Sequence, residues 1–85
     1  MTVFPRLESW NGATKMATIA ATVDKKRVLC RISLDVLKDN FGASAEDPMR
    51  SVVEYRTNIQ EVANKLIENE NYEEDGSILI RARDL

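Results

Sequence analysis

The stretch KMATIAATVDKKRVLCRIS, residues 15–33, decides the fold, because apolar residues recur at every second position on both sides of a polar turn. Alternation of this kind, with β-branched residues, is typical of strands that bury one face. We therefore predict a β-hairpin made of residues 15–23 and 27–33. The residues predicted to share its buried face are Ala17, Ile19, Ala21, Val23, Val28, Cys30 and Ile32.

The two halves of this hairpin agree on one register when the turn is centred on Lys25 and Lys26. The turn lacks the Asn-Gly pair of the tightest hairpins, so its type stays open. The cross-strand pairs expected from this register are Val23–Val28, Ala21–Cys30 and Ile19–Ile32. All three pairs are apolar, which favours one buried face for the hairpin.

Cys30 is the only cysteine in the chain, and the chain contains no histidine. A reactive thiol needs a neighbouring cation, a helix N-terminus or a metal to lower its pKa. Arg31 is adjacent in sequence, but it projects to the opposite face of the strand. We therefore interpret Cys30 as a small apolar core residue.

Two helices are predicted after the hairpin. Ser33 is a suitable N-cap for residues 34–41, and Gly42 is a suitable stop. Asp47 and Pro48 open a long amphipathic helix over residues 48–70. Arg56 interrupts its apolar stripe, so this side chain either meets a carboxylate or extends outward to water, and we favour the second alternative.

A final strand is predicted over residues 77–85, after a turn at Asp75 and Gly76. Together these elements indicate an α+β fold of order β-β-α-α-β, in which a small antiparallel sheet, the hairpin plus the C-terminal strand, packs on two helices. The 85 residues are enough for one modest core, so we expect residues 1–85 to form a single domain.

Composition excludes several functional classes. A net charge of −2 does not favour attraction to nucleic acid or acidic membranes. The absence of histidine removes the usual catalytic and zinc-binding patterns, and Glu73, Glu74 and Asp75 are not placed in any pocket by the sequence. No membrane-spanning run or signal peptide is recognisable. We therefore expect a cytoplasmic protein that is not an enzyme and uses no cofactor or metal.

Several short motifs, taken in order along the chain, resemble the DUF1488 family of small bacterial proteins of undetermined function. They are Phe4-Pro5, Ser9-Trp10, CRIS ahead of LxxxFG, YRTN in the long helix, DGSILI and a late Asp84. The chain departs from the pattern at Lys25, where the family is associated with glycine, and at Ile59, where it is associated with a basic residue. The resemblance implies an α+β fold and a bacterial origin, and it implies no activity.

The outer face of the predicted sheet is the candidate site, because it mixes arginine with apolar side chains. The residues assigned to this interaction surface are Arg27, Leu29, Arg31, Leu79, Arg81 and Arg83. Such a mixture is typical of protein interfaces, and a homodimer is the simplest form of partnership. The competing interpretation is that the N-terminal segment, with Phe4, Leu7 and Trp10, covers this face.

Nucleic-acid binding is the alternative function for the same surface. It would use the four arginines Arg27, Arg31, Arg81 and Arg83. Sheet-face RNA readers stack bases on aromatic side chains, and the predicted face has none. A protein partner is therefore favoured over nucleic acid. The acidic stretch from Glu68 to Asp75 has no role that the sequence can assign.

Overall fold

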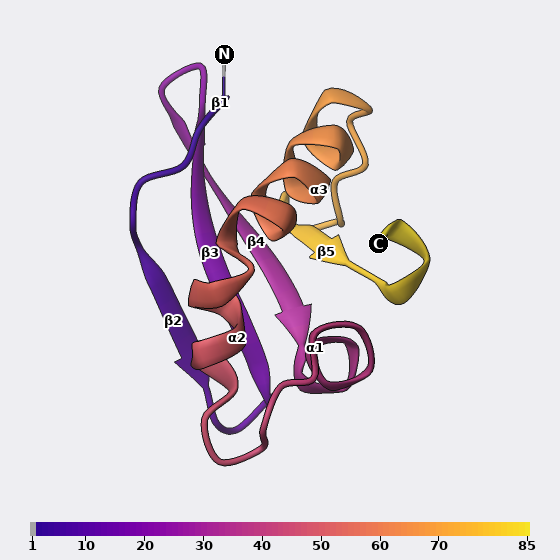
Figure 1. Ribbon diagram of the computed structural model, residues 1–85. Coiled ribbons are helices and arrows are strands. Elements are labelled where there is room, and N and C mark those ends of the chain that lie inside the picture. The colour runs from indigo at the N-terminus through magenta and orange to yellow at the C-terminus, as the bar shows by residue number, and fades with distance from the viewer. Residues whose placement is uncertain (1) are drawn as a thin grey trace.

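The protein forms one mixed sheet of five strands with its helices packed on one side (Figure 1). The structure is a computed structural model that describes residues 2–85. The strands are β1 (Thr2–Val3), β2 (Glu8–Asn11), β3 (Met16–Val23), β4 (Lys26–Ser33) and β5 (Ile78–Ile80). The helices are α1 (Leu34–Phe41), α2 (Pro48–Glu54), α3 (Arg56–Glu68) and the short 3₁₀ helix η1 (Ala82–Asp84). Among these residues, no helix has the length and apolar character needed to cross a membrane.

The predicted hairpin is present as β3 and β4, but its register differs from the prediction. Val23 pairs with Lys26, so the turn consists of Asp24 and Lys25, and Cys30 lies opposite Ile19. Both turn residues have positive φ, 48° and 72°, as a two-residue type I′ turn requires. This turn matches the twist of the flanking strands. Each residue therefore pairs with a residue two positions away from the predicted partner. Because side chains alternate between the faces with a period of two, every residue stays on the face predicted for it.

The inner face of the sheet forms the core with the helices. The predicted inner-face residues are buried, apart from Val23 at the hairpin end, which is half-buried. Leu37 from α1, Val52 from α2 and Ile59 from α3 are fully buried against them. Burial of this apolar surface stabilises the fold by roughly 25 cal/mol for each Å² removed from water.

The segment predicted as one long helix is two helices with a break at Tyr55. The backbone there turns out of helical geometry, with φ −105° and ψ 25°. The Tyr55 ring stacks on Phe41 of α1, with 4.8 Å between the ring centroids. The break allows α2 to pack near α1 and β3 while α3 packs against β5. Neither proline nor glycine marks this position in the sequence.

The final strand is shorter than predicted and runs parallel to its neighbour. β5 pairs with β4 in parallel register, with Cys30 opposite Ile78 and Ile32 opposite Ile80. The sheet is therefore mixed rather than antiparallel. Parallel pairing follows because the helical segment carries the chain back to the starting end of β4 (Figure 1). Beyond Ile80 the chain turns into η1, where the Asp84 carboxylate accepts a hydrogen bond from the Arg81 backbone N–H (2.9 Å).

The N-terminal segment adds two strands to the sheet that were not predicted. β1 and β2 both pair with β3 in antiparallel fashion and form the edge opposite β5. Phe4 and Trp10 pack against the inner core, whereas Leu7 is 51% exposed. The segment therefore extends the sheet sideways, and it does not cover the outer face.

Candidate functional site

The outer face of the sheet is left uncovered by the helices. Within residues 2–85, all three α-helices lie towards the inner face, where the buried core is found (Figure 1). Three large apolar side chains are about half exposed near the outer side: Val3 (52%), Leu7 (51%) and Leu29 (48%). We define the outer face by the residues Val3, Leu7, Ser9, Thr18, Ala20, Arg27, Leu29 and Arg31, which alternate with the inner-face positions along β1, β2, β3 and β4.

A shallow hollow occupies the centre of this outer face. It has a volume of about 280 Å³, and its lining includes Leu7, Ser9, Thr18, Ala20, Arg27 and Leu29. Ala20 lies opposite Leu29 and is only 4% exposed, so larger neighbours shield its small side chain. The hollow therefore has an apolar floor at Ala20, which lies between Leu7 and Leu29, and Arg27 lies at its rim.

Arg27 and Leu29 lie on the outer face as predicted. Arg27 is exposed, and within residues 2–85 it has no hydrogen bond or ion pair. Its charge is therefore available to a partner. Leu29 points outward next to it and contributes the largest exposed apolar side chain of β4.

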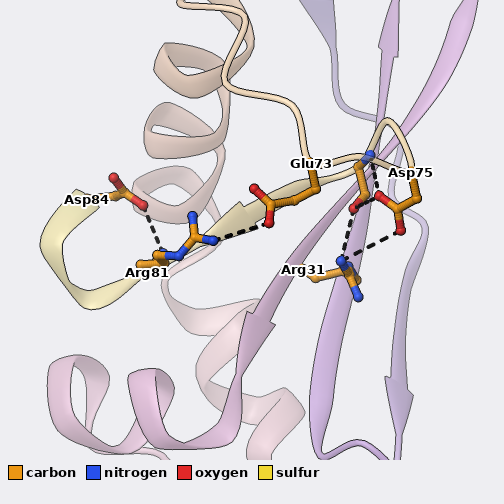
Figure 2. Close-up of polar contacts among 6 residues, drawn as sticks. Arg31, Glu73, Asp75, Arg81 and Asp84 are labelled. Atoms are coloured by element: carbon orange, nitrogen blue, oxygen red, sulfur yellow. Dashed lines mark hydrogen bonds and ion pairs between the residues drawn. The ribbon is translucent and has the colours of Figure 1, made fainter.

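Arg31 is on the same face, but its guanidinium already has internal partners (Figure 2). Its Nη2 donates to the Ser77 hydroxyl at 3.0 Å and lies 3.8 Å from an Asp75 carboxylate oxygen. Ser77 in turn donates to Asp75 from its hydroxyl at 2.6 Å and from its backbone N–H at 2.9 Å. Hydrogen bonds from Ser77, together with the charge of Arg31, lower the pKa of the Asp75 carboxyl.

Arg81 makes the second link between an arginine and the acidic loop. Its Nη2 donates to the Glu73 carboxylate at 3.2 Å. Figure 2 shows Arg31 and Arg81 both directed towards the loop that carries Glu73 and Asp75. The acidic stretch without an assigned role in the sequence therefore supplies partners for two arginines, and these contacts fix the loop that leads into β5.

Leu79, Arg81 and Arg83 lie at the β5 edge, in a separate hollow of about 210 Å³ that Leu66 and Tyr72 also line. Arg83 is exposed, whereas Leu79 is half-buried. The predicted six-residue surface is therefore divided. Arg27 and Leu29 remain on an open face, Arg31 and Arg81 are engaged within the chain, and Leu79 and Arg83 belong to the edge.

A part-buried ion pair on the inner side corresponds to the less favoured of the two alternatives for Arg56. Arg56 of α3 donates from Nε and Nη2 to the two carboxylate oxygens of Glu8 in β2, the second at 3.0 Å. The prediction that Arg56 extends outward to water is therefore wrong. The Arg56 hydrogen bonds lower the pKa of Glu8, although burial opposes the shift. An arginine inside an apolar stripe was the available signal, but its partner lies 48 positions away.

Cys30 occupies the core position that the alternation predicted. It is 0% exposed and unpaired, and burial raises the pKa of its thiol to about 11. At neutral pH the thiolate is therefore scarce, and the sulfur is out of reach of solvent. Within residues 2–85, no group of three potential ligands is placed to hold a metal ion.

Comparison with known proteins identifies the family of this fold. Residues 3–80 match the family described as "Protein of unknown function (DUF1488)".

The chain belongs to the DUF1488 family.

A crystal structure of a DUF1488 protein of unknown function from Shewanella loihica PV-4 is similar, with a TM-score of 0.85 and 23% sequence identity. The match covers 93% of this chain and 90% of that one, so the two DUF1488 proteins share the whole fold. No curated protein matches the sequence. The resemblance to DUF1488 is thus confirmed, and the function of the family is undetermined.

Proposed function

We propose that this DUF1488 protein is a non-catalytic protein-interaction module that binds its partner through the outer face of the sheet. One observation carries the proposal: the helices cover only one side of the sheet, and the other side exposes Leu7 and Leu29 around a hollow with an apolar floor. Exposed apolar side chains gathered on one surface and rimmed by polar groups are typical of interaction sites.

The charge of this face indicates the chemistry of the partner. Arg27 lines the hollow, is exposed and has no counter-ion within residues 2–85. The matching surface is therefore an apolar protein segment that carries an acidic side chain at one end. Such a pair combines apolar burial with a charge contact that fixes the orientation.

Nucleic-acid binding remains the second candidate and has weaker support. Two of the four arginines that it needs, Arg31 and Arg81, have acidic partners within the chain. Tyr72 supports it in part, because it lines hollows that include Arg27 on one side and Arg81 and Arg83 on the other. Carboxylates from Asp24, Glu73, Asp75 and Asp84 line the same hollows, and they oppose an anionic ligand.

The test is capture of partner proteins by immobilised wild-type protein and by three variants. Leu7→Ser combined with Leu29→Ser should abolish the capture of the specific partner, because it removes the apolar contact. Arg27→Glu should weaken capture in a salt-dependent way, because it opposes the acidic group. Val53→Ser is the matched control, since Val53 is 50% exposed but lies on α2, on the other side of the molecule.

The proposal fails if every captured protein is retained equally by the outer-face variants and the control. Binding of a fluorescent single-stranded oligonucleotide that is lost in Arg83→Ala and in Tyr72→Ala would instead favour the second candidate. A doubling of the solution mass that the Leu7→Ser, Leu29→Ser variant reverses would identify a second copy as the occupant of this face.

A further inference from the structure

The β2 edge of the sheet has free backbone hydrogen-bonding groups. The Leu7 carbonyl accepts a hydrogen bond from the Ala20 N–H at 3.1 Å, so this position faces β3. Bonded pairs alternate along an antiparallel ladder, so Ser9 and Asn11 also direct their backbone groups to β3. The N–H and C=O groups of Glu8 and Trp10 then point away from β3, where residues 2–85 supply no further strand (Figure 1).

We propose that two copies of the chain pair along β2, antiparallel and about a twofold axis at Ser9, so that their sheets become continuous. In this register Ser9 faces Ser9 of the second copy, and Glu8 faces Trp10 of the second copy. The outward groups are self-complementary, because each Glu8–Trp10 pair exchanges two hydrogen bonds. A twofold axis requires such self-complementarity, and β2 provides it with its own sequence.

The side chains of β2 are compatible with this pairing. Exposed edges are commonly protected by proline, by lysine or by a charge that points into the sheet, and β2 contains no proline or lysine. Its one charged residue, Glu8, is held by Arg56, so the Glu8 carboxylate does not repel an approaching strand. Ser9 is small and exposed, which suits the close contact at a non-hydrogen-bonded pair.

This pairing is independent of the proposed outer-face function, because it uses the backbone edge rather than Leu29. It would place the two outer faces side by side on one continuous sheet. Each copy would keep its hollow around Leu7 and Leu29 open to a partner. The assembly would therefore present two partner-binding faces on the same side.

Disulfide trapping tests the register directly. In the proposed dimer the two Ser9 Cα atoms lie about 4.5 Å apart, within the range that a disulfide spans. Ser9→Cys should therefore form a covalent dimer under mild oxidation, seen on a non-reducing gel. Leu7→Cys is the matched control: it is also exposed and on the outer face, but its counterpart would lie roughly 13 Å away, too far to bridge. Native Cys30 is buried and does not compete.

Sedimentation of the unmodified protein provides the second readout. Wild type should show concentration-dependent dimers, and Ser9→Lys should raise the dissociation constant about fivefold or more, because like charges then lie directly opposite. Urea unfolding should show that Ser9→Lys leaves the monomer stable. The proposal is overturned if wild type stays monomeric at the highest concentration, or if Leu7→Cys cross-links as fast as Ser9→Cys. Leu29→Ser should leave the cross-linking of Ser9→Cys unchanged, because Leu29 takes no part in the β2 pairing. Loss of the Ser9 cross-link would therefore count against the β2 dimer alone, and loss of partner capture in the Leu29 variant would concern the outer-face function alone.

Discussion

The two faces of the β3–β4 pair both carry large apolar side chains, but these side chains are in opposite environments. On the inner face, Cys30 and Ile32 are buried under helices, with exposures of 0% and 1%. On the outer face, Leu29, which directly precedes Cys30, is 48% exposed. The difference shows that alternation determines which residues share a face, whereas the packing of the helices determines which face is buried. Whether a leucine in a strand is buried or exposed therefore depends on residues far along the chain.

The largest expected effect is on the inner face. Ile32→Ala should lower the free energy of unfolding by about 2–5 kcal/mol, because it opens a cavity at a residue packed on all sides. Leu29→Ala, its matched control on the outer face, should change it by no more than about 0.5 kcal/mol. Urea unfolding of both variants measures the contrast. Equal losses in the free energy of unfolding would mean that the outer face is covered in solution, so that the two faces do not differ in burial.

A smaller effect is expected at Cys30. Cys30→Ala should cost about 1–2 kcal/mol, because the cavity left by one sulfur atom is small. A thiol reagent at pH 7.5 should label the native protein slowly, because burial raises the pKa of this thiol to about 11. In urea the same thiol should react at the rate of a free cysteine. Rapid labelling of the folded protein would show that the inner face opens more readily than the structure indicates.

The smallest of the three effects concerns the ion pair where β2 meets α3. Glu8→Gln should lower stability by about 1 kcal/mol at pH 7, since the pair is partly screened by solvent. The pKa of Glu8 is lowered in the folded state, so the carboxylate stabilises the fold above its unfolded pKa. This stabilisation should disappear as the pH falls through the folded pKa.

Unfolding curves of wild type and Glu8→Gln, measured from pH 7 to pH 3, check the sign. The difference between the two proteins should be largest near neutral pH and should shrink in acid. A difference that stayed constant over this range would mean that Glu8 acts through packing rather than through its charge.

Residue patterns were sufficient to predict the parts of the fold that depend on near neighbours. Alternation placed the inner-face residues correctly, and Ser33 and Gly42 delimit α1 as predicted, with the Ser33 hydroxyl accepting from the Val36 N–H and Gly42 in the left-handed conformation. These features are local, because a cap or an alternation needs only the residues beside it.

The features that were wrong or missed depend on distant contacts or on weak local signals. Lys25 adopts positive φ in the turn although lysine does not signal it, so the predicted register was off. Alternation carries no information on strand direction, so the parallel pairing of β5 was not predicted. The acidic partners of Arg31 and Arg81 lie on a loop, and only the folded chain brings them together. The candidate site was therefore predicted in part. Arg27 and Leu29 lie on the open outer face as predicted, whereas the internal contacts of Arg31 and Arg81 were not predicted.

The parallel pairing of β5 with β4 has a consequence for the order of folding. The β3–β4 hairpin closes through a two-residue turn, and such hairpins form within about 1–10 μs. The Cys30–Ile78 pair can form only after α1, α2 and α3 have been brought across the sheet, which carries a larger loop-closure entropy. We expect β5 to join the sheet late, so that an intermediate lacking it would expose the backbone edge of β4. Such an edge is a template for pairing with other chains, so we expect the chain to aggregate most readily before β5 joins the sheet.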